Sequence, residues 1–152
     1  MNKRITVLLV LCLLLIASVA PTTTTVAASP ALDEPPPLPQ AFYGTVRLNE
    51  QPAPVGTRIE VRGPGVLTGI EGNPLIVTVA GHYGSRSLAE PRLVVQGNVA
   101  EGAPLAFYID GMRAQVQRPN GAWQLTFPFE AGALTELNLR APIKLYLPFV
   151  VR

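Results

Sequence analysis

Apolar and polar residues alternate in short runs along most of the chain, and glycine, proline or asparagine separates one run from the next. The first run of the series shows the pattern clearly, with Phe42, Val46 and Leu48 on one face. Alternation with a period of two is typical of a β-strand that buries one face. We predict strands at residues 42–48, 57–62, 75–80, 92–96, 105–109, 112–116, 121–127 and 133–139. None of these runs has the period of a helix.

One turn in this series has a specific signal. Asp110-Gly111 separates the apolar runs 105–109 and 112–116, and Asp-Gly favours a two-residue hairpin turn because both central residues need positive φ. Seven or eight strands within about 100 residues predict an all-β fold, a single antiparallel β-sandwich of the Ig-like or prealbumin-like kind. We place this domain at residues 41–141. A partly open barrel would produce the same pattern, because the sequence does not order the strands.

The N-terminal part of the chain has the features of an export signal. Lys3 and Arg4 precede an almost uninterrupted apolar run at residues 5–19, which is shorter than a membrane-spanning helix requires. Small residues at 26–28 fit a cleavage site. We therefore predict a signal peptide at residues 1–28 and a secreted or cell-surface protein. An uncleaved N-terminal anchor is the alternative.

Cys12 is the only cysteine, and it lies within the apolar run of the predicted signal. Leu11 before it is not small, which argues against a lipoprotein signal. Removal of the signal leaves no thiol for a disulfide, a nucleophile or a metal ligand. It also removes Lys3 and Arg4, so that ten Lys and Arg residues balance ten Asp and Glu residues. A neutral chain without a basic cluster is not predicted to bind nucleic acid.

Two further segments flank the predicted domain. Residues 29–40 hold five prolines, and we interpret them as a semi-rigid linker of polyproline geometry; a ligand for a proline-recognising domain is the alternative. Residues 142–152 form a C-terminal tail that is too short to span a membrane, so no span is predicted after signal cleavage. The tail resembles the short Tyr-Leu-Pro tails of other exported proteins. It is either an address read by surface machinery or an edge strand.

Residues that commonly perform chemistry are few. His82 is the only histidine, and neither Ser85 nor Ser87 lies in a Gly-x-Ser-x-Gly nucleophile elbow. One histidine without a mature cysteine does not supply a zinc site, and the acids lack the spacing of a calcium loop. We predict no cofactor, no metal site and no enzymatic activity, and we interpret His82 as a loop residue. A small hydrolase centred on His82 is a third hypothesis.

Four aromatic residues are candidates for a ligand surface on which sugar rings would stack. They are Tyr43, Tyr83, Tyr108 and Trp123. The alternative is packing within the fold, with the tyrosines half buried and their hydroxyl groups in water. Trp123 alternates with Leu125 and Phe127, which favours a place for Trp123 in the core.

Residues 42–46 and the segment Asn49-x-x-Pro-Ala-Pro-x-Gly-Thr-x-Ile59 are predicted to form a strand, a turn and the start of a second strand. This order resembles the opening of carboxypeptidase-regulatory-like and Cna-B-like sandwich modules. Later landmarks of the resemblance are residues 81–84, 107–111 and 137–139. The resemblance spans residues 42–140 and implies a prealbumin-like fold, a stalk, adhesion or accessory role, and no catalytic residues. Glu50 stands where the pattern usually has glycine, so this turn is expected to take another conformation.

Together these features predict an exported, non-catalytic structural or adhesive module of the cell surface. Its partner would be an unidentified protein or glycan, bound by loops at one end of the sandwich or by an exposed strand edge. The leading alternative is a carbohydrate-binding module that uses exposed aromatic residues.

Overall fold

The computed structural model describes residues 35–87 and 89–142. The predicted signal peptide at residues 1–28 and the tail from residue 143 onward lie outside these residues. The described part of the chain forms twelve strands and no helix, which confirms the all-β prediction. It therefore holds no helix of the length and apolarity needed to cross a membrane.

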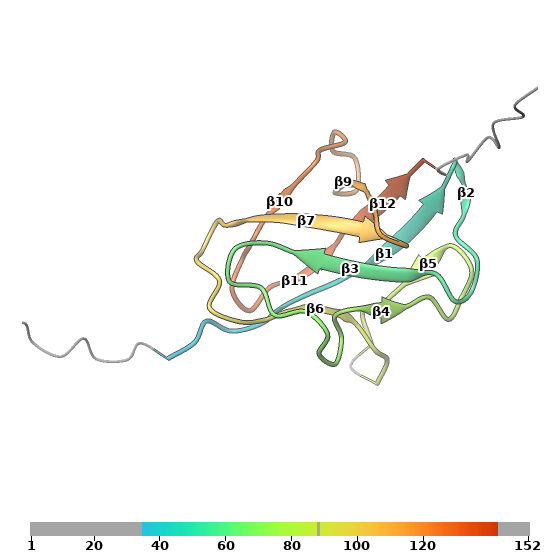
Figure 1. Cartoon of the computed structure of the whole chain (residues 1–152). Helices are drawn as coiled ribbons and strands as arrows, with labels where there is room; N and C mark the ends of the chain where they lie inside the picture. The colour runs from blue at the N-terminus through green and yellow to red at the C-terminus, as the bar shows by residue number, and fades with distance from the viewer. Residues whose placement is uncertain (1–34, 88, 143–152) are drawn as a thin grey trace, which may run out of the picture. The chain divides into compact units, whose positions relative to one another are not determined.

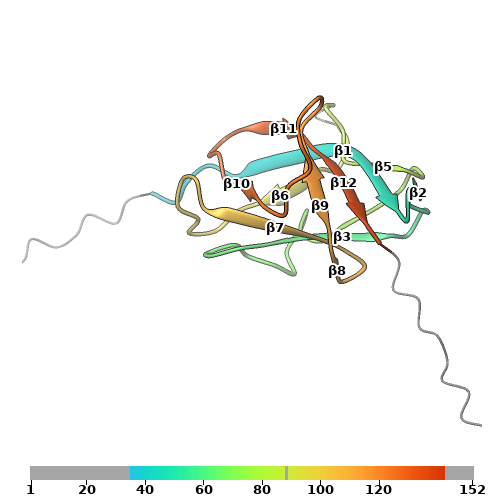
Figure 2. The ribbon, with the colours of Figure 1, turned by 90° about the horizontal axis from the view of Figure 1, so that it is seen from above.

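The twelve strands form two sheets (Figure 1). The seven-stranded sheet contains β1 (Gln40–Leu48), β2 (Gln51–Pro52), β5 (His82–Tyr83), β6 (Leu93–Val95), β9 (Gln115–Gln117), β11 (Leu134–Glu136) and β12 (Asn138–Ala141). The five-stranded sheet contains β3 (Arg58–Arg62), β4 (Leu75–Ile76), β7 (Pro104–Ile109), β8 (Met112–Arg113) and β10 (Phe127–Pro128). Figure 2 shows β1 in one layer and β3 and β7 in the other, which is the arrangement of a β-sandwich.

The core lies between the sheets and is built from inward-facing residues that the alternation predicts. Phe42 of β1 is fully buried, and its ring meets those of Phe107 and Phe127 edge-on, with centroids 5.2 and 5.8 Å apart. Because Phe42 belongs to one sheet and both partners belong to the other, these contacts join the sheets. Ile59 and Val61 of β3 are also fully buried. Edge-to-face contacts add about 0.5–1.5 kcal/mol to the effect of burial.

The pairing of β1 corrects the prediction of a purely antiparallel sandwich. β1 pairs in parallel with β11, where Ala41 lies opposite Leu134, and with β12, where Val46 lies opposite Leu139. Its pairings with β2, β5 and β6 are antiparallel, so the seven-stranded sheet is mixed. The alternation of a strand shows which side chains face inward, but it carries no information about the direction of the neighbouring strand.

β11 and β12 both pair in parallel with β1, and Leu137, which lies between them in the chain, interrupts this ladder. Its amide donates to the carbonyl oxygen of Tyr43 at 2.9 Å, and its own carbonyl oxygen faces Gly44, where a β-carbon would overlap it. The hydroxyl of Tyr83 donates to this same oxygen at 2.7 Å. Glycine at position 44 therefore permits the close approach of the last strands to β1.

The strands are shorter and more numerous than the seven or eight predicted. Residues 112–116 divide at Ala114 into β8, which pairs with β7, and β9, which pairs with β12 in the other sheet. Residues 133–139 divide at Leu137, and of residues 75–80 only Leu75–Ile76 forms a strand. The division at Ala114 shows the reason, because β8 pairs with the adjacent β7 whereas β9 pairs with the distant β12.

Residues 121–127 illustrate the same effect for Trp123. Gln124 exchanges both main-chain hydrogen bonds with Val116 of β9, each at 2.8 Å, whereas Phe127 belongs to β10 in the five-stranded sheet. The segment therefore crosses between sheets, and its side chains do not share one face. Trp123 is only half-buried and Leu125 is 57% exposed, so the predicted place of Trp123 in the core is wrong.

The β7–β8 and β1–β2 hairpin turns use left-handed backbone. Asp110 and Gly111 have φ of 47° and 78° between β7 and β8, which confirms the predicted two-residue turn. Asn49 and Glu50 have φ of 50° and 63° between β1 and β2. Glu50 thus adopts a conformation that favours glycine in spite of its side chain, so the expectation that glutamate would give this turn another conformation is wrong.

Candidate functional site

Tyr83 lies in the interior of the sandwich. It is 1% exposed, and its hydroxyl is held by the carbonyl oxygen of Leu137. Burial raises the pKa of the Tyr83 hydroxyl well above its ordinary value, because the phenolate would lose its hydration. The side chain therefore belongs to the packing of β5 against the last strands and lines no ligand surface.

The other three aromatic candidates are half-buried, and each lies beside an arginine. The guanidinium carbons of Arg86, Arg62 and Arg140 lie 5.8, 4.5 and 4.2 Å from the ring centroids of Tyr43, Tyr108 and Trp123. Tyr43 is on β1 of the seven-stranded sheet, whereas Tyr108 is on β7 of the five-stranded sheet. The structure therefore does not bring the four candidates together into one stacking platform.

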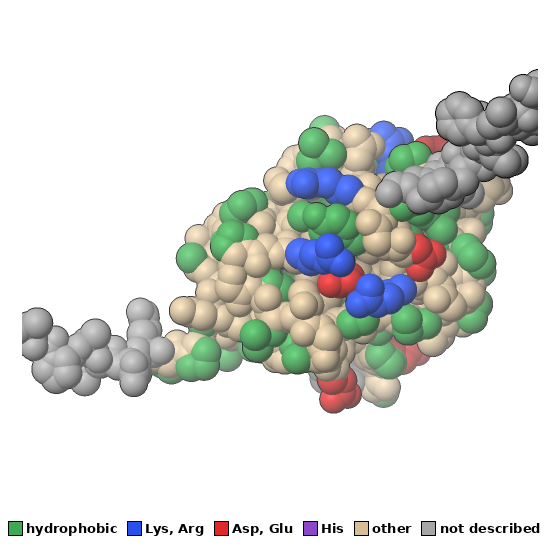
Figure 3. All heavy atoms as spheres, viewed as in Figure 1, with side chains coloured by type: hydrophobic (Ala, Val, Ile, Leu, Met, Phe, Trp, Pro, Cys, Tyr) green, Lys and Arg blue, Asp and Glu red, His purple; other side chains and the backbone are tan. Residues whose placement is uncertain are grey.

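The outer face of β3 carries a compact charged cluster. Glu60 is covered by Arg58 and Arg62, which approach its carboxylate to 2.8 and 2.9 Å, and Figure 3 shows blue side chains around a red one on this face. The hydrogen bond from Arg62, together with the charges of both arginines, lowers the pKa of Glu60 against the opposing effect of burial. The carboxylate of Glu60 is thus neutralised and hydrogen-bonded by the two guanidinium groups, and we interpret the cluster as a structural part of the sheet surface.

His82 lies on β5 at the surface of the molecule. Its amide donates to Val79 O at 3.0 Å, whereas its side chain makes no hydrogen bond to any described residue. The hydroxyl of Ser85 accepts from the amide of Ser87 at 3.0 Å and not from His82. Across residues 35–87 and 89–142, no three His, Cys, Asp or Glu side chains gather in a way that would hold a metal ion.

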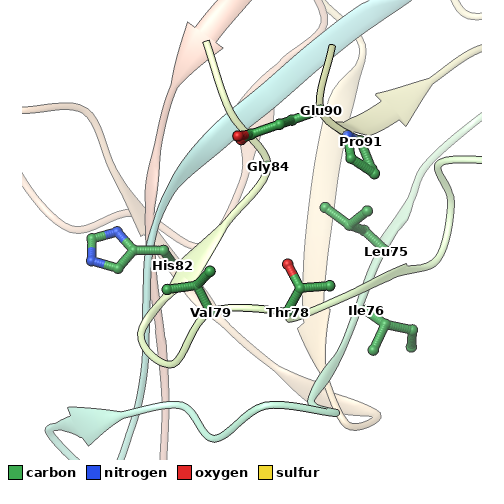
Figure 4. A pocket seen from close by; sticks show the side chains of 8 residues that line it. All are labelled: Leu75, Ile76, Thr78, Val79, His82, Gly84, Glu90 and Pro91. Atoms are coloured by element: carbon green, nitrogen blue, oxygen red, sulfur yellow. The ribbon is translucent and has the colours of Figure 1, made fainter. Parts of the chain in front are cut away.

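A hollow of about 600 Å³ lies between β4 and β5 (Figure 4). We call it the β4 edge groove. It is lined by Leu75, Ile76, Thr78, Val79, His82, Gly84, Glu90 and Pro91. Figure 4 shows the imidazole of His82 directed away from Leu75 and Pro91, so the apolar side chains dominate the groove and Glu90 is the one acidic group among the lining residues.

The groove follows the edge of the five-stranded sheet. In the described part of the chain β4 pairs with β3 alone, so one side of its main chain has no neighbouring strand. β4 is short because the side chain of Asn73 pairs with Val61 of β3, accepting from its amide at 3.0 Å and donating to its carbonyl at 2.9 Å. The side-chain amide of Asn73 thus takes the hydrogen bonds of Val61 that the main chain of a longer β4 would make.

The aliphatic side chains along this edge include both buried and exposed residues. Leu75 and Val77 are buried, whereas Ile76 is 47% and Val79 is 62% exposed. The prediction of a full strand at residues 75–80 did not reveal this exposure, because two exposed and two buried aliphatic residues look alike in the sequence. Exposed apolar side chains beside an unpaired strand edge favour the binding of another chain.

Comparison of the chain with family models, with curated proteins and with solved structures finds no match. The resemblance to carboxypeptidase-regulatory-like and Cna-B-like modules therefore stays a prediction.

Proposed function

We propose that this protein is an exported, non-catalytic structural or adhesive module that binds an extended apolar segment of a protein partner along the β4 edge groove. The observation that carries the proposal is the coincidence of an open strand edge with exposed Ile76 and Val79 beside a hollow of about 600 Å³. An added strand gains main-chain hydrogen bonds from the edge and specificity from its alternate side chains.

The proposal includes export of the protein and a prealbumin-like form of the sandwich. The apolar run at residues 5–19 behind Lys3 and Arg4 supports export. A prealbumin-like sandwich is supported by two facing sheets and by the two-residue turns at Asn49-Glu50 and Asp110-Gly111. An exported module of this kind would present the groove to partners at the cell surface.

A second candidate function, carbohydrate binding, has a different observation in its favour. A hollow of about 450 Å³ is lined by Asn49, Glu50, Gln115, Arg140, Ala141 and Pro142. Gln115 accepts from Arg140 Nε at 2.9 Å, and the guanidinium lies over the ring of Trp123. Planar polar side chains beside an aromatic ring suit the hydroxyl groups of a sugar.

A defined peptide probe tests the first proposal. The probe has ten residues, with valine and threonine in alternation and lysine at both ends, and its binding is followed by fluorescence anisotropy. We expect saturable binding that Ile76→Asp weakens by about tenfold or more, because the substitution places a charge against apolar side chains. Leu125→Asp is the matched control, since Leu125 is similarly exposed but does not line the groove, and it should change the affinity by less than about twofold.

Two further controls separate edge pairing from general stickiness and from sugar binding. A probe with proline at alternate threonine positions has lost donors for the strand edge and should not bind. Equal binding of both probes, or equal binding by wild type and Ile76→Asp, would refute the proposal. A glycan array screened with wild type and Gln115→Ala tests the second candidate, which requires a sugar signal that the substitution removes.

A further inference from the structure

The C-terminal segment of the chain has the pattern of a strand with one fully apolar face. Residues 143–152 lie outside the described residues, and their sequence is Ile-Lys-Leu-Tyr-Leu-Pro-Phe-Val-Val-Arg. Every odd-numbered position holds a large aliphatic or aromatic residue, and Lys144 and Arg152 stand at even-numbered positions. In an extended conformation the five side chains at odd-numbered positions would point to the same side, and Tyr146, Pro148 and Val150 would lie on the other side with Lys144 and Arg152.

We propose that residues 143–152 of one copy of this protein add to the edge strand β4 of a second copy and place their apolar face in the β4 edge groove. This inference rests on the proposed function, because it names the occupant of the same groove. It makes the protein a component of head-to-tail assemblies at the cell surface.

The groove and the segment are complementary in polarity and in charge. Leu75, Ile76, Val79 and Pro91 offer apolar surface to an apolar strand face. Glu90 is the only charged residue that lines the groove, whereas the segment carries two positive charges and no acid. A cationic strand is therefore favoured over an acidic one at this edge.

The length of the segment is sufficient for this contact. Ten extended residues span at most about 33 Å, whereas β4 offers a strand of two residues, Leu75–Ile76, followed by the exposed Val79. A short stretch of the segment therefore covers the groove and leaves residues at its start to bridge the two copies. Pro148 lacks an amide donor, which is tolerated at a strand edge when its nitrogen faces away from the neighbour.

The position of β12 favours a second copy over the same chain. Ala141, at the end of β12, accepts from the amide of Asn49 at 2.9 Å, so the last described strand ends beside the β1–β2 turn. β12 belongs to the other sheet from β4, and Figure 1 shows its arrow pointing away from β4. A segment that continued the direction of β12 would lead away from the β4 of its own copy, whereas a return to that strand would require a reversal of the chain.

The contact is heterologous, because the surface used on one copy differs from the surface used on the other. Such contacts extend into open chains or close into rings, of which a reciprocal exchange of segments between two copies is the smallest. We therefore expect a monomer in equilibrium with dimers or larger species, whose share grows with concentration.

Sedimentation velocity of the full-length secreted chain over a dilution series tests this expectation. The perturbing variants are Ile76→Asp in the groove and Leu147→Asp on the apolar face of the segment. The matched controls are Leu125→Asp, an exposed leucine elsewhere, and Tyr146→Asp, which makes the same charge change on the opposite face of the segment. We expect each perturbing variant to raise the concentration at which assembly begins by about tenfold or more, and each control by less than about twofold.

Disulfide trapping identifies the occupant directly. In the secreted chain, which is expected to have lost Cys12 with the signal, molecules with Ile76→Cys are mixed with molecules that carry Leu147→Cys, and oxidation should link one to the other. A chain with both substitutions should form linked multimers at high concentration. Intramolecular closure of that double variant at every dilution would show that the segment occupies its own groove, and would overturn the proposal.

The two proposals fail in different ways. Binding of the alternating peptide probe without any effect of Leu147→Asp on assembly would overturn the inference about the segment and leave the groove as a peptide site. If wild type neither binds the peptide probe nor assembles, the proposed function and the inference about the segment are both overturned. Thermal unfolding of each variant by circular dichroism confirms that the folded domain is retained, as the exposure of Ile76 predicts.

Discussion

Replacing Tyr83 with phenylalanine removes one hydroxyl group from the interior and keeps the ring. In the native protein this hydroxyl donates to the Leu137 carbonyl oxygen at 2.7 Å, and Tyr83 is 1% and Leu137 0% exposed. The carbonyl of the variant would keep no donor and no access to water. An unsatisfied buried acceptor costs about 1–3 kcal/mol, and we expect Tyr83→Phe to lose that amount of unfolding free energy.

Urea unfolding followed by Trp123 fluorescence measures this loss. For a domain of this size each kcal/mol lowers the melting temperature by about 4 °C or somewhat more, so a thermal scan provides a second estimate. The urea m-value should stay the same, because the surface exposed on unfolding is unchanged. A loss below about 0.3 kcal/mol would refute the reasoning, since it would mean that water or another donor replaces the hydroxyl.

Alkaline pH gives an independent test of the same side chain. Burial raises the pKa of Tyr83 in the folded state, whereas the unfolded chain ionises near the ordinary value of 10.0. Above that pH the unfolded state loses a proton that the folded state keeps, so the advantage of wild type over Tyr83→Phe should fall by about 1.4 kcal/mol per pH unit. A constant difference between pH 9 and pH 11 would contradict the burial of this hydroxyl.

Two further predictions concern β3 and the glycines. The pKa of Glu60 is lowered by Arg62 and Arg58. Its carboxylate therefore contributes to the free energy of unfolding above the ordinary pKa of 4.5, and this contribution is lost as pH falls through the lowered pKa. Glu60→Gln should lose less stability than wild type between pH 5 and pH 2 in urea titrations, and an equal loss would contradict the ion pairs. Gly111→Ala, at φ 78° in open space, should lower the free energy of unfolding by about 1–2 kcal/mol from backbone strain alone. Gly44→Ala also brings a β-carbon against the Leu137 carbonyl and should lower it by about 3 kcal/mol or more. Equal losses in thermal unfolding would refute the close approach of Leu137 to Gly44.

Local features of the sequence determined the individual strands. In β1 and β3, apolar residues at every second or fourth position identify Phe42, Val46, Ile59 and Val61 as core, and all four are buried. The Asp110-Gly111 turn was equally predictable, because positive φ at two successive positions depends on the residues themselves. These features are set by contacts between neighbours in the chain and need no knowledge of the rest of the fold.

The candidate site was only partly predictable. An exposed strand edge was expected as a possible binding surface, but its place was not. β4 is an edge because its only described neighbour is β3, and it is short because the side chain of Asn73 pairs with Val61 of β3. The aromatic candidates show the converse. Tyr83 and Trp123 were grouped by residue type, and the structure buries the first and leaves the second half-exposed under Arg140.

By itself, then, the sequence determined the all-β class, the inward face of the long strands and the position of one hairpin turn. The tertiary structure alone decided that β1 runs parallel to β11 and β12, that residues 112–116 and 121–127 divide between sheets, and that Ile76 and Val79 face an open groove. The physical reason is the range of the interactions. Alternation records which face of a strand is buried, whereas the partner and direction of that strand are set by hydrogen bonds to residues that lie tens of positions away in the chain.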